Sequence, residues 1–283
     1  MLKGHCLCGT VTWKADAEPT PLSHCHCGMC RKAHGAPFVT FTSCPKAALT
    51  WTSGEEAIRE YTSSPGLLRR FCGLCGSALP GEIDSLDEAS IPVGGMNPEP
   101  DLTGGPHIFT GSKLPWMAVP EDAEDHDTYP EDEPLPVIDR APMQMAEGDA
   151  PLAGSCLCGD VAFEIDAPFT AIFNCHCSRC RMARAAAHAT NGFVPGKALR
   201  FSRGEDTIVD FKLPEAAAFG QAFCKTCGSG VPRYNALREM YNVPLGVLDV
   251  LSATGPSAHI FVASKATWHE IADDIPQFEG SVT

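Results

Sequence analysis

The cysteines are the residues of this sequence whose type and spacing could carry chemistry. The chain has 283 residues and 15 cysteines, and 14 of them form two sets with the same order, CxC, CxCxxC and CxxC. Cysteines this close together are better placed to bind a metal ion than to close long loops as disulfides. The first set is Cys6, Cys8, Cys25, Cys27, Cys30, Cys72 and Cys75, and the second is Cys156, Cys158, Cys175, Cys177, Cys180, Cys224 and Cys227. No apolar signal region precedes them, so we expect a cytoplasmic protein that binds zinc.

The seven thiols of each set divide naturally into four and three. Four thiolates close a tetrahedral structural zinc site, whereas three leave one position for water or substrate. The outer CxC and CxxC pairs would tie the start of a small domain to its later strands, and the central CxCxxC triple can wrap one metal ion locally. The alternative is a closed triple, completed by His26 or His176. Since a residue between two ligands generally points away from their shared metal, we prefer the open triple.

The two cysteine sets belong to an internal repeat. Residues 4–30 and 154–180 share 13 identities in 27 positions without a gap, and two later blocks recur at an offset of 152 residues. A period near 150 indicates tandem domains rather than a solenoid of short units. We therefore expect a first zinc domain over residues 1–120 (copy one), an acidic, proline-rich linker over 121–150 and a second zinc domain over 151–283 (copy two).

Local patterning favours short strands. Residues 11–15, 38–41 and 161–165 are rich in β-branched or aromatic side chains and roughly alternate in polarity. The 26 glycines and 24 prolines leave little room for long helices, and residues 181–187, which are good helix formers, are the exception. We expect a mainly β chain built of two tandem zinc-binding domains.

The charge and hydropathy exclude two classes of partner. Lys and Arg number 21 against 35 Asp and Glu, giving a formal net charge of −14. Nucleic-acid binding needs a basic face that displaces phosphate counterions, so no nucleic-acid partner is expected. No run approaches the roughly 18 apolar residues of a membrane-spanning helix, so no membrane partner is expected either.

Other conspicuous residues have plainer explanations. His107 and His259 lie in apolar segments and are expected in the core or in hydrogen bonds rather than as catalytic bases. Trp116 and Trp268 are expected to anchor the core. Cys44 has no counterpart in the second set, and we expect it to be a buried, small hydrophobic residue.

The motifs also resemble a known family. The pairs GHCLCGTV and GSCLCGDV, HCHCGMC and NCHCSRC, FCGLCGS and FCKTCGS, and HIFTGSKLPW and HIFVASKATW are similar to the glutathione-dependent formaldehyde-activating enzyme family, which shares a domain with centromere protein V. The resemblance implies an Mss4-like β fold with two zinc ions per domain and four per chain. The structural zinc ions would be held by Cys6, Cys8, Cys72 and Cys75, and by Cys156, Cys158, Cys224 and Cys227. The catalytic-type zinc ions would be held by Cys25, Cys27 and Cys30, and by Cys175, Cys177 and Cys180.

The same resemblance implies an activity. It indicates a zinc-dependent carbon–sulfur lyase acting on adducts of glutathione, or a related thiol, with formaldehyde or another small aldehyde. Three thiolate ligands leave zinc soft, which suits thiol chemistry better than water activation. From their positions, Arg31, Lys32 and Arg181 could receive the carboxylates of glutathione. The alternative hypothesis is a non-catalytic zinc-stabilised module that presents a β surface to a protein partner.

Overall fold

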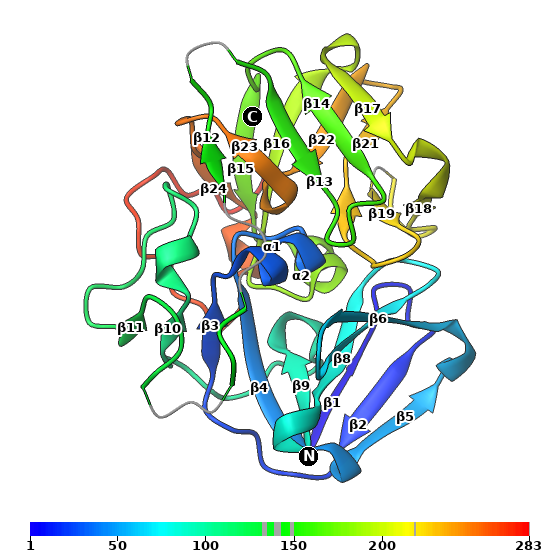
Figure 1. The fold of residues 1–283 in the computed structure, drawn as a ribbon, viewed down its shortest axis with the longest axis vertical. Coiled ribbons are helices and arrows are strands. Elements are labelled where there is room, and N and C mark those ends of the chain that lie inside the picture. The colour runs from blue at the N-terminus through cyan, green and yellow to red at the C-terminus, as the bar shows by residue number, and fades with distance from the viewer. Residues whose placement is uncertain (132–134, 139–142, 148–149, 218, 283) are drawn as a thin grey trace.

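The computed structural model describes residues 1–131, 135–138, 143–147, 150–217 and 219–282. The chain is mainly β, as expected, and its described part contains two short α-helices. In Figure 1 the strands of copy one and of copy two occupy opposite ends of the molecule, and both helices lie between them. The repeat seen in the sequence is therefore a repeat of structure.

Copy one contains a three-stranded sheet and an eight-stranded sheet. Their strand orders are β1-β2-β5 and β11-β10-β3-β4-β9-β8-β7-β6. The strands are β1 (Leu2–His5), β2 (Thr12–Ala15), β3 (Ser23–Cys25), β4 (Val39–Pro45), β5 (Leu49–Ser53), β6 (Ile58–Ser64), β7 (Leu67–Cys72), β8 (Ala78–Ile83), β9 (Glu88–Pro92), β10 (His107–Ile108) and β11 (Asp125–His126).

Copy two repeats this arrangement with one sheet divided. Its sheets have the orders β12-β23-β13-β14-β17, β21-β22-β16-β15-β24 and β18-β19-β20. The strands are β12 (Gln144–Met145), β13 (Leu152–Ser155), β14 (Ala162–Ile165), β15 (Ala171–Cys175), β16 (Ala189–Pro195), β17 (Leu199–Arg203), β18 (Ile208–Lys212), β19 (Gly220–Cys224), β20 (Gly230–Val231), β21 (Arg233–Asn235), β22 (Met240–Pro244), β23 (Leu248–Leu251) and β24 (Ala258–Ile260). The three expected strands correspond to β2, β4 and β14, although β4 continues to Pro45.

Each helix begins inside a cysteine triple. Helix α1 covers Gly28–His34 and α2 covers Ser178–Arg184, and the cysteine before each helix accepts a backbone N–H bond through its sulfur. The expected helix over 181–187 therefore starts and ends earlier, because Ala185 adopts a left-handed conformation with φ of 48°. Local helix propensity indicated the element but missed this C-cap.

The two copies exchange core side chains. Trp268 and Ala266, which lie near the end of copy two, are buried in the core that contains Trp13 and Leu2 of copy one. In the reverse direction, Leu114 is fully buried in the core of copy two, and Trp116 packs against the same core. Both tryptophans thus contact a core, as expected, but each contacts the core of the other copy. The copies cannot separate without exposing these side chains.

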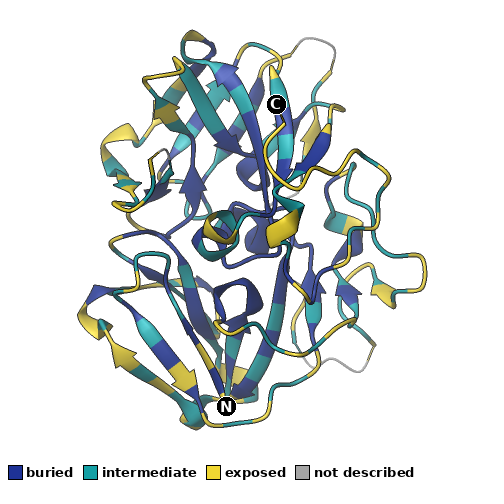
Figure 2. Cartoon of the chain, turned by 180° about the vertical axis from the view of Figure 1, so that it is seen from behind, coloured by how far each residue is buried: buried dark blue, intermediate teal, exposed yellow. Residues whose placement is uncertain are grey.

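The helices form the centre of the interface between the copies; α1 is almost entirely buried, whereas the first turns of α2 remain exposed or half-buried (Figure 2). Helix α1 packs on the 3-10 turn Leu245–Val247 of copy two, and α2 packs on the equivalent turn Val93–Gly95 of copy one. The contacts are close enough to require glycine: a Cβ at Gly94 would lie 2.2 Å from the Ala186 nitrogen. A Cβ at Gly246 would lie 2.5 Å from the Ala36 oxygen, so the packing is reciprocal.

The stretch expected to be a linker contributes strands to both copies. Strand β11 pairs in parallel with β10, and β12 pairs in parallel with β23. Residues 132–134, 139–142 and 148–149 of this stretch lie outside the described residues. The division of the chain after residues 120 and 150 remains a prediction.

Among the described residues, neither helix has the length and apolar character that a bilayer-crossing helix needs.

Candidate metal centres and active site

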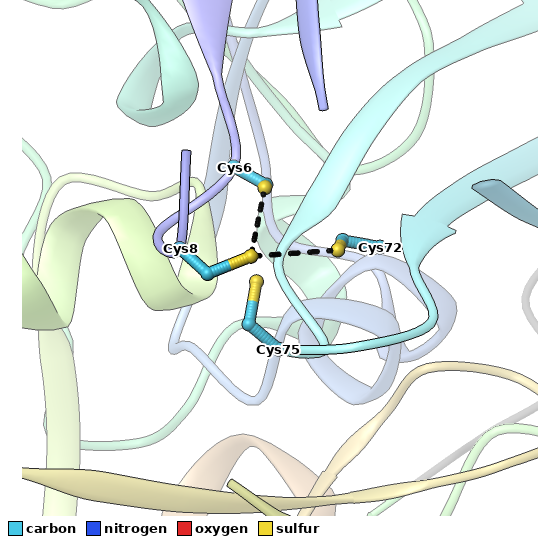
Figure 3. A group of neighbouring side chains, drawn as sticks. All are labelled: Cys6, Cys8, Cys72 and Cys75. Atoms are coloured by element: carbon cyan, nitrogen blue, oxygen red, sulfur yellow. Dashed lines mark hydrogen bonds between the residues drawn. The ribbon is translucent and has the colours of Figure 1, made fainter. Parts of the chain in front are cut away.

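The outer cysteine pairs of each copy converge. In copy one the CxC pair follows β1 and the CxxC pair lies in the turn between β7 and β8, and Figure 3 shows the four side chains directed toward one another. Cys8 Sγ lies 3.4 Å from Cys6 Sγ and 3.9 Å from Cys72 Sγ. The corresponding distances in copy two are 3.4 and 3.7 Å. The two copies therefore build the same four-sulfur group.

These distances suit a tetrahedral metal site. Zinc–sulfur bonds of about 2.3 Å at tetrahedral angles place ligand sulfurs about 3.8 Å apart, whereas a disulfide bond is about 2.05 Å long. All 15 cysteines are free thiols. The backbone N–H groups of Val11 and Val161 donate to the first sulfur of each group at 3.3 and 3.2 Å, which favours thiolates there. Each four-cysteine group can hold a metal ion.

The two triples form smaller groups at the helix N-termini. Cys25 ends β3, Cys27 caps α1 and Cys30 lies in the first turn of that helix. The N–H of Cys30 donates to Cys27 Sγ at 3.3 Å, and in copy two the N–H of Cys180 donates to Cys177 Sγ at 3.4 Å. The three sulfurs of each triple lie within 4.8 Å of one another. Each triple can therefore also hold a metal ion.

The histidines inside the triples face away from the sulfurs. His26 Nε2 lies 2.9 Å from His107 Nδ1, and His176 Nε2 lies 2.7 Å from His259 Nδ1. In copy two the chain of hydrogen bonds continues, because His259 Nε2 donates to Asp273 Oδ1 at 2.9 Å. Burial lowers the pKa of both His26 and His176 to about 3. None of these histidines joins a triple, so each group keeps three sulfurs.

Arg69, which the sequence marks only as part of the basic pair Arg69-Arg70 able to receive a small anion, is a candidate functional residue beside the triple. It lies on β7, donates from Nη2 to Cys30 Sγ at 3.5 Å, and is held by an Nε bond to Ser63 Oγ at 3.0 Å. Hydrogen bonds from Cys25 and Cys27, together with the Arg69 guanidinium, hold the pKa of Cys30 well below its usual range. A thiolate beside a fixed cation is therefore favoured in the triple of copy one.

The triple of copy two obtains its neighbouring cation from a different element. Gln221 stands at the position of Arg69, and Arg184 of α2 stands at the position of His34. Burial lowers the pKa of Arg184 to about 10, although the Cys180 thiolate acts in the opposite direction. Both triples thus have an arginine nearby, supplied by a strand in copy one and by the helix in copy two.

A cavity of about 280 Å³ lies beside the triple of copy one. Cys25, Cys30 and Arg69 line it on one side. Most of the remaining lining is aliphatic or aromatic, and it includes Phe41, Leu67, Leu68, Leu79, Ile83 and Leu86. Three potential metal ligands, one cation and an apolar cavity thus meet at one place, an arrangement typical of small-molecule sites.

The cations expected to bind glutathione carboxylates serve the interface instead. Lys32 Nζ lies 2.5 Å from Asp249 Oδ1, and Arg181 Nη1 lies 2.6 Å from Glu99 Oε1, and each of these ion pairs joins the two copies. Arg31 is only 1% exposed, so a ligand from solvent would not reach it. The expectation for these three residues is not supported. Closeness in sequence to the cysteines did not reveal which side of the helix each cation takes.

The chain is similar to a protein family, to a curated protein and to a solved structure. A protein-family model described as glutathione-dependent formaldehyde-activating enzyme matches residues 1–112 and 151–264. An uncharacterized lyase of Schizosaccharomyces pombe is 38% identical over 77 residues, which are 27% of this chain and 54% of that protein. The chain therefore matches about half the length of that relative. A crystal structure of a Rhodobacter sphaeroides protein is similar at 24% identity and a TM-score of 0.28, covering 37% of this chain and 91% of that one.

Proposed function

Because the chain belongs to the glutathione-dependent formaldehyde-activating enzyme family, we propose that it is a lyase that makes and breaks the carbon–sulfur bond between a thiol and an aldehyde carbon. The thiol would be glutathione or a related small thiol, and the aldehyde formaldehyde or another small aldehyde. The observation that carries the proposal is the cysteine triple of copy one, which borders a cavity and has the Arg69 guanidinium beside it.

The donor sets support zinc as the metal. Thiolates in groups of four and three are ligand sets that zinc accepts, and the sulfur spacing in the four-cysteine groups matches tetrahedral coordination. We infer four zinc ions per chain, one in each cysteine group. The four-cysteine groups would be structural, and at least one of the two triples would be of the catalytic type. A zinc ion held by three thiolates would offer a coordination position to a thiol sulfur and lower the pKa of that thiol.

The residues of the chain would assist through charge and the exclusion of water. In the forward direction the thiol sulfur forms a bond to the carbonyl carbon, the carbonyl electron pair moves to oxygen, and that oxygen takes the proton that the thiol gave up. The reverse reaction breaks the same carbon–sulfur bond and returns both reactants. Arg69 would stabilise the negative charge beside the triple, where the apolar lining lowers the local dielectric and strengthens the attraction.

The proposal is tested by the release of formaldehyde from preformed S-hydroxymethylglutathione after dilution. The adduct also dissociates without help, so the measured quantity is the acceleration above the protein-free rate. We expect acceleration by the wild type, its loss in the double variant Cys27→Ser with Cys177→Ser, and its retention in the matched control Cys44→Ala. Cys44 is buried outside all four groups.

Equal rates for the wild type, loaded with four zinc ions per chain, and for the double variant, measured with a panel of aldehydes, would contradict the proposal. That result would favour the non-catalytic module that binds a protein partner.

A further inference from the structure

We propose that the two copies have different functions. Copy one binds the reacting adduct and prefers an adduct that carries an apolar chain, whereas the triple of copy two is a structural centre. This inference rests on the proposed function and names its substrate class. It follows from the lining of the cavity, from the charges around it and from the residues that replace that lining in copy two.

The cavity beside the copy-one triple is more spacious and more apolar than formaldehyde requires. Formaldehyde contributes a single carbon, whereas the cavity has a volume of about 280 Å³. Beyond the triple, its lining includes the side chains of Phe41, Leu79, Ile83 and Leu86. Covering apolar surface is favourable by about 25 cal/mol per Å². An aldehyde-derived group with a chain of several carbons would cover this lining, and a hydroxymethyl group would not.

The charges around the cavity place the polar part of the ligand outside it. Arg69 faces the sulfurs of the triple, where the sulfur of the ligand would gain negative charge as its bond to the aldehyde carbon breaks. Arg70 also lines the cavity, but it bonds Glu60 at 2.8 Å and Glu82 at 2.6 Å. Glu88, a further lining residue, would repel a carboxylate. The charged remainder of a thiol such as glutathione would therefore lie toward solvent, with the apolar chain inside.

Copy two does not reproduce the apolar lining. Equivalent residues of the two copies differ by 150 in residue number in the first part of each copy and by 152 in the later part. The pairing of equivalent strands agrees with these offsets. At the positions of Phe41, Ile83 and Leu86, copy two has Asn191, Asn235 and Arg238. At the positions of the lining residues Ser23, Ser43 and Glu88, in contrast, copy two has Phe173, Phe193 and Met240, and the rings of Phe173 and Phe193 pack together with centroids 6.3 Å apart. The apolar side chains of the two copies thus stand at different positions, and in copy two large rings replace the small serines that border the copy-one cavity.

The space next to the copy-two triple is filled by protein. The Arg184 side chain lies over Gly230, so close that a Cβ on this glycine would be 1.6 Å from Arg184 Nη1. The counterparts of these two residues in copy one are His34 and Ala78, and both line the cavity. The buried Arg184 side chain therefore occupies space that copy one leaves for a ligand.

Copy two nevertheless completes the site of copy one. Cys227, from the four-cysteine group of copy two, lies in the lining of the copy-one cavity. Gln221, the counterpart of Arg69, donates its amide N–H to the Cys75 carbonyl across the interface. The residue that could have assisted a second active site thus holds the two copies together. This assigns a structural role to copy two and explains why both copies lie in one chain.

Equilibrium binding of two unreactive thioethers, S-methylglutathione and S-hexylglutathione, tests the inference on the full-length, zinc-loaded chain by isothermal titration calorimetry. We expect the wild type to bind the hexyl compound at least tenfold more tightly. Ile83→Asn and Leu86→Arg, which place the copy-two residues in copy one, should each reduce this preference to less than threefold. The matched changes in copy two, Asn235→Ala and Arg238→Ala, should leave it unchanged.

Ile83 and Leu86 are only half-buried, so the variants are expected to fold. Because the two positions are tested separately, a local folding defect at one of them would not by itself explain the loss of the preference at both. Equal affinity of the wild type for the two thioethers, or an equal loss from the copy-two changes, would overturn the inference. Thioether binding requires no bond to break. A chain-length preference that depends on Ile83 would therefore support this inference even if lyase activity were absent, and activity without the preference would overturn only this inference.

Discussion

Replacing Trp268 by alanine should destabilise the copy to which the residue does not belong in sequence. The indole is 3% exposed and is buried in the core of copy one. Truncating a buried tryptophan to alanine costs about 3–5 kcal/mol, through lost transfer energy and the cavity left behind. This is a large fraction of the roughly 5–15 kcal/mol that stabilises a typical domain. We therefore expect Trp268→Ala to open copy one first.

Hydrogen–deuterium exchange followed by mass spectrometry can locate the loss. After Trp268→Ala, the amides of β1, β2 and β5 should exchange faster, whereas those of β13, β14 and β17 should change less. The matched variant is Trp116→Ala, whose side chain packs against the core of copy two. Because Trp116 is only half-buried, its loss should cost roughly 2 kcal/mol and should affect β13, β14 and β17.

Faster exchange confined to copy two after Trp268→Ala would refute the exchanged packing. It would mean that each copy completes its own core, and that the two copies are independent folding units.

Three further outcomes follow from the cysteine groups and from the buried histidines. Elemental analysis of the reduced protein should approach four zinc ions per chain, and a saturated value of two would exclude the triples as metal sites. Cys72→Ser should lower the melting temperature more than Cys27→Ser, since metal binding at the closed group is folding free energy; the opposite order would reverse the structural and catalytic assignments. Burial lowers the pKa of His34 to about 4, so the folded state binds fewer protons than the unfolded state between that value and about 6.5. On going from pH 7.5 to 5.5, His34 alone should therefore lower the stability by about 1 kcal/mol, and His26 and His176, whose pKa values are also lowered by burial, should add to this loss. Urea denaturation should show a smaller pH dependence for His34→Gln than for the wild type.

The cysteine groups were predictable because the repeat supplied the same pattern twice. The order CxC, CxCxxC, CxxC left one economical division into four and three, and the structure brings together those same groups. The β class followed from short alternating segments, and the orientation of His26 followed from its place between two ligands. Each of these properties is set by local spacing.

The packing between the copies could not be predicted in this way. The segments around Trp116 and Trp268 have the same motif, and a local motif gives no indication of which core it will enter. The contact of Arg69 with the triple could not be predicted because Arg69 lies 39 residues from its partner Cys30 and because copy two has glutamine there. Arg31 and Lys32 were favoured for being next to a cysteine, although Arg31 is buried and Lys32 forms an ion pair with Asp249 of the other copy. Long-range contacts that differ between the copies leave no repeated signal.

The central claim is that the cysteine triple of copy one promotes the making and breaking of a carbon–sulfur bond. The most direct measurement is the equilibrium exchange rate between free and glutathione-bound ¹³C-formaldehyde, followed by NMR, because it reports both directions at once. The wild type should exchange faster than the protein-free mixture, and Cys30→Ser should return the rate to that of the mixture while the zinc content falls by no more than one ion per chain. Exchange that is equally fast with and without the protein, at four zinc ions per chain, would contradict the account.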